Sequence, residues 1–451
     1  MKLLAFFTVA ALLCGCASVP WPAQTVAPGR SIVPALALTE AAASSKIHHV
    51  VIIFQENRTT DNLFNGLAGA DTVRTGLDSA NERVKLAPVS LKAPYDVSHE
   101  HGAFLIERAN GKLNGWNLVH SDCTKSGGCP PRNRRAYGYV PRTEVEPYFT
   151  MAQRYTFADR MFQTNEGPSF PAHQYIVSGT STISNGSPLR AASNALSPLG
   201  GFTGGCDSVP GSYVYVIDAA GNENQATFPC FDRTALMDLL DQKAVSWTYY
   251  QQHPGAGLWE APDAIYHIRH SKEFAADVIS PPSRILTDIT AGKLAHVVWL
   301  TPTSLESDHA GGTNGSGPSW VASVVNAIGR SQYWDDTAIF VTWDDWGGWY
   351  DHVPPPAYNS YELGFRVPLI AISPYAKTHY VSHAQHEFGS ILKFIEETFG
   401  LPSLDTTDVR SDDLSDCFDF SSAPKKFVPI PAPLSPKYFL DQPESSGSID
   451  Y

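Results

Sequence analysis

The stretch TAIFVTWDDWGGWYDHVPPP, Thr337–Pro356, places acids directly after an apolar run. It opens with apolar and β-branched residues, a composition typical of a buried strand. Asp344 and Asp345 follow at once, and two glycines, Asp351 and His352 come next. Adjacent carboxylates repel each other unless a cation or a proton neutralises one of them. The stretch therefore indicates a strand that ends in a metal site, although one Asp pair alone could also be turn residues that bind loop amides.

Three other apolar runs are followed by polar residues in the same way. They are His48–Gln55 before Glu56 and Asn57, Ala295–Pro302 before Asp308 and His309, and Arg366–Ser373 before a loop with His379, His383 and His386. Continuous apolar strands suit a parallel sheet that is covered on both faces. Residues 234–244, 318–334 and 388–400 have the spacing of helices between such strands. We therefore predict a three-layer α/β/α sandwich, in which ligands bind beyond the carboxyl ends of the strands.

These strand ends define a candidate cation site. Carboxylates, an amide oxygen and imidazoles at one sheet edge suit a hard or borderline divalent metal ion. The pattern does not identify the ion. Asp351 and His352 are expected to support the loop after the acid pair and not to be ligands.

Composition and the N-terminus limit the function classes. The formal net charge of -13 over 451 residues argues against nucleic acid as the main partner. Residues 1–16 have a positive start, a short apolar core and the sequence LCGC, which predicts a lipoprotein signal peptide with a lipid anchor on Cys16. A plain secretory peptide is the alternative. Either predicts export, to the periplasm or the cell envelope.

The remaining chain divides into three expected parts. Residues 17–45 are a Pro/Ala/Ser-rich tether, residues 46–420 the catalytic domain and residues 421–451 a Pro-rich tail. Within the domain, residues 71–150 and 180–232 lack the strand and helix pattern, and we interpret them as insertions that form a lid or a pocket wall. In an exported protein the pairs Cys123/Cys129 and Cys206/Cys230 are expected disulfides, which leaves Cys417 over.

Ser169 lies in TNEGPSFPAHQYIVSGT, Thr164–Thr180. A serine with proline just after it is a common helix start, so capping is the structural interpretation. The same position faces free N–H groups that can hold a phosphate, and a metal ion could activate the hydroxyl as a nucleophile. The chain contains no G-x-S-x-G elbow and no Walker loop, which weakens esterase-triad and nucleotide-binding interpretations.

Histidines gather in two further segments, with His99 and His101 in one and His253, His267 and His270 in the other. A lone histidine is usually a surface or hydrogen-bonded residue. In a phosphoryl site, protonated imidazoles can neutralise the transferring oxygens, and one can protonate the leaving group.

Six blocks together resemble a known family. They are HHVVIIFQENRTTDNLF (48–64), GPSFPAHQYIVSGT (167–180), ESDHAGG (306–312), FVTWDDWGGWYDHVPPP (340–356), GFRVPLIAISPYAK (364–377) and SILKFIEETFGL (390–401). They look like the signature blocks of the bacterial phosphoesterase family that holds phosphatidylcholine-type phospholipases C and the respiratory-burst-inhibiting acid phosphatases. The resemblance runs from about residue 47 to about residue 420 and implies an alkaline-phosphatase-like fold.

The resemblance also implies roles for single residues. Glu56, Asn57, Asp344 and Asp345 would hold a divalent metal ion with Ser169, and Ser169 would be the nucleophile. His99 and His309 match two site histidines. A third falls in residues 250–270, where His267 fits the HI-x-x-S block better and His253 stays open. Asp308, His101 and His352 are weaker site candidates.

The sequence departs from the family pattern in three ways. The DE-x-GG block reads DDWGG, the late DHTS block reads EFGS (Glu387–Ser390), and the C-terminal domains of the longer phospholipases are not seen. His386 is a weak substitute for the missing histidine. The expected function is an exported metal-dependent phosphoesterase that acts on a phosphate ester, which could be a phospholipid. The alternatives are an inactive lipoprotein that binds phosphate or a partner and, more weakly, a sulfatase.

Overall fold

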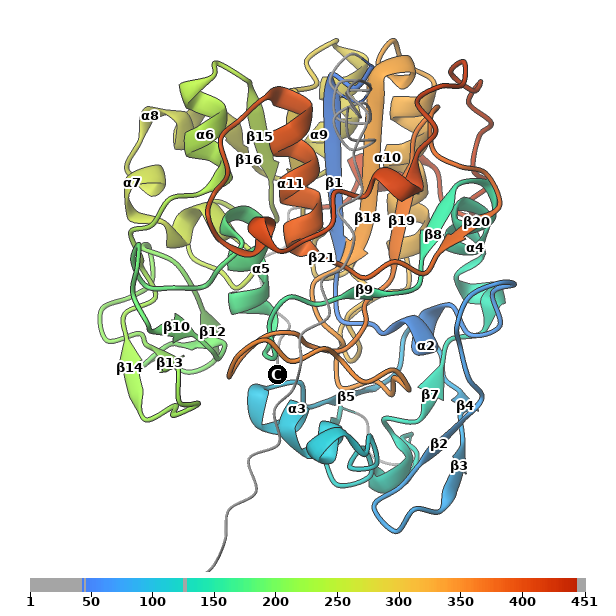
Figure 1. The fold of residues 1–451 in the computed structure, drawn as a ribbon, viewed down its shortest axis with the longest axis vertical. Coiled ribbons are helices and arrows are strands. Elements are labelled where there is room, and N and C mark those ends of the chain that lie inside the picture. Colours follow the sequence, from blue (N-terminus) through green and yellow to red (C-terminus); the bar gives the residue numbers. More distant parts are fainter. Residues whose placement is uncertain (1–42, 44–45, 125–127, 444–451) are drawn as a thin grey trace, which may run out of the picture.

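An eight-stranded mixed sheet forms the centre of the computed structural model, which describes residues 43, 46–124 and 128–443 (Figure 1). Its strands, in spatial order, are β16 (Val278–Ile279), β15 (Trp247–Tyr250), β17 (Val297–Leu300), β1 (His49–Gln55), β18 (Thr337–Trp343), β19 (Leu369–Ile372), β8 (Thr156–Ala158) and β20 (Tyr380–Ser382). β1 and β18 are buried because nearly every residue in them is apolar. The predicted signal peptide and most of the predicted tether lie outside the described residues.

Helices cover both faces of the sheet, which confirms the predicted three-layer arrangement (Figure 1). One layer contains α4 (Glu146–Arg154), α9 (Arg284–Thr290), α10 (Gly317–Gly329) and α12 (Pro436–Leu440); the other contains α5 (Ser169–Ser178), α6 (Leu236–Gln242) and α11 (Phe388–Phe399). α11 ends at Gly400, which has φ +61° and caps the helix as its position in the sequence predicts. The short helices α2 (Thr60–Leu63), α7 (Tyr266–Arg269) and α8 (Lys272–Asp277) lie in connections.

The direction of β19 differs from the prediction of a parallel sheet. β19 runs antiparallel to both of its neighbours, β18 and β8. A parallel return needs a crossover of a dozen or more residues, usually a helix, and residues 344–368 contain no helix. The carboxyl end of β19 therefore lies at the opposite edge of the sheet from the ends of β1 and β18, and it brings no ligand to their edge.

The two predicted insertions lie beyond the carboxyl ends of β1 and β18 (Figure 1). The first contains β2 (Thr75–Leu77), β3 (Arg83–Lys85), β4 (Ala87–Pro88), β5 (Tyr95–Val97), α3 (His101–Arg108), β6 (Ser121–Cys123) and β7 (Gly138–Tyr139); the second contains β10 (Arg190–Ala191), β11 (Ala195–Leu196), β12 (Phe202–Thr203), β13 (Val214–Ile217) and β14 (Gln225–Thr227). Each holds one of the two predicted disulfides, Cys123–Cys129 and Cys206–Cys230. The first insertion also contributes side chains to the site described below.

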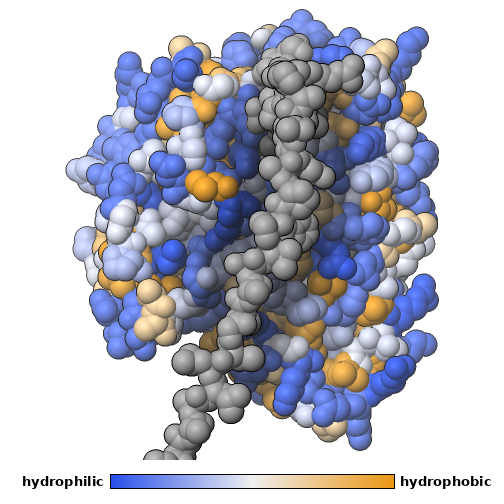
Figure 2. All heavy atoms as spheres, viewed as in Figure 1, coloured by the Kyte–Doolittle hydropathy of each residue, from blue (hydrophilic) through white to orange (hydrophobic). Residues whose placement is uncertain are grey.

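Outside the sheet, β9 (Met161–Phe162) pairs with β21 (His386–Glu387). The described part of the tail packs on the domain, with the Phe439 ring 5.3 Å from that of Trp320 on α10. Hydrophobic residues are scattered among hydrophilic ones on the face drawn in Figure 2. None of the helices in the described ranges has the length and apolar character to cross a bilayer.

Candidate active site

The register of the two central strands brings the first acids together. Gln55 pairs with Trp343 at the end of the β1–β18 ladder, so the residues after each strand become neighbours. Asn57 has φ +59°, a left-handed conformation that asparagine tolerates better than most residues. Its backbone N–H donates to Asp344 Oδ1 at 3.0 Å. The turn after β1 is thereby fixed against the acid pair.

Ser169 is the first residue of α5, but its hydroxyl does not cap the helix. Pro168 is the N-cap, and no side-chain cap bond forms there. The Ser169 hydroxyl instead donates to Asp345 Oδ2 at 3.2 Å. Asn57 Nδ2 donates to the same Asp345 oxygen at 2.9 Å and lies 3.3 Å from Ser169 Oγ. Ser169, Asn57 and Asp345 therefore form one buried triangle of polar atoms.

His173, which no sequence pattern singled out, completes an acidic cluster. It is fully buried, and its Nε2 lies 3.1 Å from Glu56 Oε1 and 3.9 Å from Asp344 Oδ2. It stands four residues after Ser169 on α5, and residues four apart share one helix face. That spacing was the signal in the sequence that could have identified it.

The residues of this cluster fit a divalent cation. Glu56, His173 and Asp344 each offer one ligand atom, and these atoms lie within 4.8 Å of one another. Asp344 Oδ2 is buried and accepts no hydrogen bond from any described residue. A buried carboxylate oxygen without a donor is costly unless a cation compensates it. Two carboxylates and an imidazole suit a borderline divalent ion such as Zn²⁺ or Mn²⁺.

The two glycines after the acid pair permit close approaches. A Cβ on Gly347, at φ +61°, would lie 2.4 Å from the Asn57 carbonyl oxygen. A Cβ on Gly348, at φ +67°, would lie 2.5 Å from Val97 Cγ1. Only glycine therefore lets this loop pack against both the Asn57 turn and the segment that carries His99.

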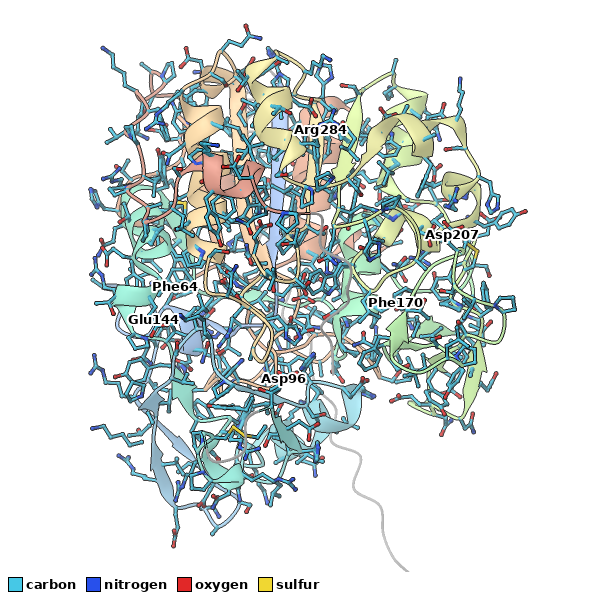
Figure 3. All side chains as sticks on the ribbon, turned by 180° about the vertical axis from the view of Figure 1, so that it is seen from behind. Phe64, Asp96, Glu144, Phe170, Asp207 and Arg284 are labelled. Atoms are coloured by element: carbon cyan, nitrogen blue, oxygen red, sulfur yellow. A yellow bond between two sulfur atoms is a disulfide. The ribbon has the colours of Figure 1, made fainter. Side chains whose placement is uncertain are left out.

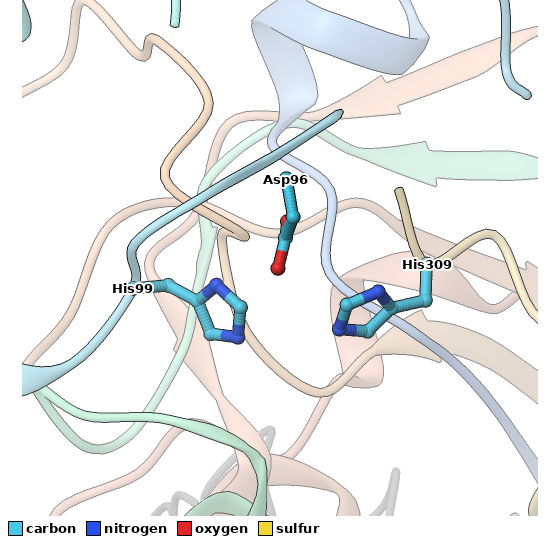
Figure 4. Close-up of side chains that lie close together, drawn as sticks. All are labelled: Asp96, His99 and His309. Atoms are coloured by element: carbon cyan, nitrogen blue, oxygen red, sulfur yellow. The ribbon is translucent and has the colours of Figure 1, made fainter. Parts of the chain in front are cut away.

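A second cluster lies next to the Asn57 amide. Asp96, His99 and His309 are buried, and one ligand atom of each lies within 4.8 Å of the others (Figure 4). Asp96 and His99 come from the first insertion, below the sheet in Figure 3, and His309 comes from the loop after β17. His99 Nε2 lies 3.2 Å from Asn57 Nδ2. The structure thus joins His99 and His309 to the Ser169 triangle.

A buried acid lies close to both clusters. Trp346 Nε1 donates to Glu107 Oε2 at 2.7 Å. Burial raises the pKa of Glu107 well above its ordinary value, and the nearby charge of Asp345 acts in the same direction. A neutral Glu107 adds no further negative charge to a site that already holds several carboxylates.

The weaker candidates occupy different places. His101 is buried against Glu166 and Glu223, and these hydrogen bonds outweigh burial and raise its pKa to about 9. Asp308 accepts bonds from Tyr148 and Trp343, at 2.8 and 3.0 Å, and burial raises its pKa to about 6.

The loop after the acid pair is fixed by ion pairs. His352 Nδ1 lies 2.6 Å from Asp61, and Asp351 pairs with the buried Arg366 at 3.0 Å. The supporting role of Asp351 and His352 stays a prediction.

The structure does not place His267 with the two clusters. Its side chain is 40% exposed, and its ring nitrogens lie 2.6 and 2.8 Å from Asp232 and Asp238. His253 Nδ1 lies 3.9 Å from the buried Glu260. His386, the substitute considered for the missing family histidine, contacts Asp412 at 2.5 Å.

A buried hydroxyl, an amide donor, acids and imidazoles at the carboxyl edge of an α/β sheet define an enzyme site. The chain belongs to the Phosphoesterase family, whose profile matches residues 47–402, and it is by class a phosphoric ester hydrolase. Phospholipase C A of Mycobacterium tuberculosis is 24% identical in an alignment 445 positions long, which covers 85% of this chain and 79% of that protein. Non-hemolytic phospholipase C of Pseudomonas aeruginosa is 22% identical and covers 83% of this chain, which spans 58% of that protein. A solved structure from the alkaline phosphatase superfamily, from Vibrio parahaemolyticus, aligns over 84% of this chain and 77% of its own at a TM-score of 0.38 and 11% identity.

Proposed function

We propose that the protein is an exported, metal-dependent phosphoesterase that uses Ser169 as its nucleophile. The observation that carries the proposal is the buried triangle of Ser169 Oγ, Asn57 Nδ2 and Asp345 Oδ2, with edges of 3.3, 2.9 and 3.2 Å. A hydroxyl that donates to a carboxylate, and not to its own helix, is free to be turned toward a substrate. The relatives named phospholipase C support a phosphate ester as the substrate.

Each residue of the triangle has a chemical task in this proposal. Ser169 Oγ forms a bond to phosphorus while the ester P–O bond breaks, and its proton passes to Asp345 Oδ2, to which the hydroxyl donates at 3.2 Å. The leaving ester oxygen takes a proton from water and departs as the alcohol. Asn57 Nδ2 donates toward Ser169 Oγ and Asp345 Oδ2. It can therefore also donate to an oxygen of a phosphoryl group that is bonded to Ser169. Water then hydrolyses the phosphoserine and releases phosphate, or a phosphate monoester if the substrate was a diester.

Glu56, His173, Asp344 and Asp345 would hold the divalent ion. When bound, such an ion supplies positive charge that lowers the pKa of a neighbouring hydroxyl and stabilises phosphoryl oxygens. The N-terminal segment, which lies outside the described residues, carries the proposed export signal and lipid anchor on Cys16.

Hydrolysis of p-nitrophenyl phosphate and p-nitrophenyl phosphorylcholine, measured side by side with and without chelator, tests the proposal. Ser169→Ala should abolish turnover of whichever ester is cleaved, and chelator should do the same. Ser178→Ala is the matched control, because Ser178 is the last residue of the same buried helix. Turnover that survives in Ser169→Ala, with Ser178→Ala behaving like wild type, would overturn the serine mechanism. Preference for the phosphorylcholine ester would identify a phospholipase C, and preference for the monoester a phosphatase.

A further inference from the structure

We propose that a pocket at the end of α5 opposite Ser169 binds the phosphate group of a small phosphorylated alcohol. The pocket has a volume of about 570 Å³. A helix rises about 1.5 Å per residue, so the last residue of α5 lies about 14 Å from Ser169 and the pocket is separate from the candidate active site. Three segments line the pocket: residues between 179 and 190 together with Thr234, then Asn359 and Glu362, and residues between 404 and 410.

Arg190 brings a cation with unused donors to this pocket. Its Nε donates to no described residue, and the carboxylate of Glu362 lies 3.6 Å from it, beyond hydrogen-bond distance. Glu362 is already engaged, because one oxygen accepts the Tyr175 hydroxyl and the other accepts Arg410, both at 2.7 Å. The Arg190 side chain is 24% exposed, so a ligand in the pocket can reach its guanidinium. A guanidinium binds phosphate oxygens well, and such an oxygen would supply the missing acceptor.

Three hydroxyls of the lining also have hydrogens to donate. They belong to Thr180, Ser187 and Thr234, and each oxygen accepts an N–H of a nearby residue at 3.1 or 3.2 Å. None of the three donates to another of the described residues. A hydroxyl that already accepts a hydrogen bond keeps its own hydrogen for a ligand. This wall therefore offers donors to a group with several acceptor oxygens, and phosphate is such a group.

A second arginine lies behind the same wall. Arg233 is 1% exposed and donates to the carbonyl of Thr182, which lines the pocket, at 2.8 Å and to Gln174 Oε1 at 2.5 Å. Both acceptors are neutral, and its Nε donates to no residue of the described ranges. Burial lowers the pKa of Arg233 to about 9, which leaves the side chain charged at neutral pH. A buried charge without a counter-ion is costly, and an anion in the pocket would offset part of that cost.

Asp405 explains why the ligand should carry a hydroxyl as well as a phosphate. It lines the pocket and is exposed, so its carboxylate lies on the rim. A carboxylate repels a bare phosphate ion but accepts a hydrogen bond from an alcohol. A phosphate monoester of a small polyol, of which glycerol 3-phosphate is the simplest probe, matches the donors around Arg190 and the acceptor at Asp405.

Equilibrium dialysis of the Ser169→Ala protein with labelled glycerol 3-phosphate tests the proposal without turnover. Binding in the pocket should persist in chelator, whereas binding at the candidate active site should be the part that chelator removes. Arg190→Gln, added to Ser169→Ala, should weaken the chelator-resistant binding at least about 10-fold, because it removes a charge-assisted hydrogen bond. Arg83→Gln is the matched control, since Arg83 is exposed on β3 in the first insertion, and it should bind like the parent protein.

Asn185→Asp is a second variant with little risk to folding. Asn185 is exposed on the pocket lining, and aspartate keeps the oxygen that accepts the Thr234 N–H at 3.0 Å. The added negative charge should weaken binding as Arg190→Gln does.

Two results would overturn the site: chelator-resistant binding that is the same in both variants as in the parent, or no such binding up to about 10 mM ligand. Neither result would affect the proposed phosphoesterase, which is tested by loss of turnover in Ser169→Ala. Tighter binding of inorganic phosphate than of glycerol 3-phosphate would overturn the alcohol part of the proposal and identify free phosphate as the ligand.

Discussion

Replacing Asp344 with asparagine should stabilise the protein when no divalent ion is present and should remove most of the stabilisation that a divalent ion gives. Asp344 Oδ1 accepts the Asn57 N–H at 3.0 Å, and an asparagine oxygen can keep that bond. Asp344 Oδ2 is fully buried, and no described residue donates a hydrogen bond to it. The substitution therefore exchanges a buried charge for a neutral amide and leaves the one existing hydrogen bond in place.

The expected sizes follow from these contacts. Burying an uncompensated ion costs several kcal/mol, and an unpartnered neutral group costs about 1–3 kcal/mol. Without metal, Asp344→Asn should thus stabilise the protein by about 1–3 kcal/mol. An ion at 100 times its dissociation constant stabilises wild type by about 2.7 kcal/mol, and the variant should lose most of that gain because it lacks a ligand.

Thermal unfolding of both proteins in chelator and in excess Mn²⁺ or Zn²⁺ measures the difference. Asp308→Asn is the control, because Asp308 is equally buried but already accepts bonds from Tyr148 and Trp343. Its effect on the unfolding midpoint should be the same in both conditions. A shift of the same sign and size for Asp344→Asn in both conditions would refute the assignment of Asp344 as a ligand.

Three further perturbations have defined outcomes. His173→Gln should weaken binding of the divalent ion held by Glu56, His173 and Asp344 at least about 10-fold in a Co²⁺ titration, because the ring contacts Glu56 at 3.1 Å; unchanged affinity would remove His173 from the site. Burial raises the pKa of Glu260 from 4.5 to about 8. Between these pH values the folded state holds a proton that the unfolded state releases, so the free energy of unfolding falls as the pH rises from 4.5 to about 8. Glu260→Gln should flatten that decline in pH-dependent unfolding, and an unchanged slope would contradict it. Gly348→Ala should lower both the unfolding midpoint and kcat, because its Cβ would meet Val97 Cγ1 at 2.5 Å. Gly111→Ala is the control, because Gly111 has φ +86° and a Cβ there would meet nothing within 4 Å. It should cost only about 1 kcal/mol of backbone strain and leave kcat unchanged.

Local sequence patterns predicted the central strands well. The apolar runs before Glu56 and Asp344 became β1 and β18, with bounds that differ from the prediction by at most one residue. The acids after them meet because the strands are adjacent and parallel, which the shared pattern implied. β19 has the same apolar composition but runs the other way, and only the lack of a helix between residues 344 and 368 could have shown it.

Contacts between distant segments were harder to predict. His173 was missed because a histidine in an apolar helix looks like a core residue, and its partner Glu56 lies 117 positions away. His267 was preferred to His253 as a site residue because it fits the short HI-x-x-S block. In the structure His267 lies at the surface against Asp232 and Asp238, and these contacts join segments about 30 residues apart that a local block does not describe. Asp96 was not singled out as a site residue. Its convergence with His309 requires the first insertion to dock on the loop after β17.

The most direct test of the central claim is to trap the enzyme during turnover. The metal-loaded protein is mixed with p-nitrophenyl phosphate, or with the phosphorylcholine ester if that is the better substrate, and quenched in acid. Peptide mass spectrometry then locates any bound group. The proposed mechanism predicts one phosphoryl-containing adduct on Ser169, which is not formed in Ser169→Ala and still forms in Ser178→Ala. Turnover with an adduct on another residue, or with full activity in Ser169→Ala, would contradict it.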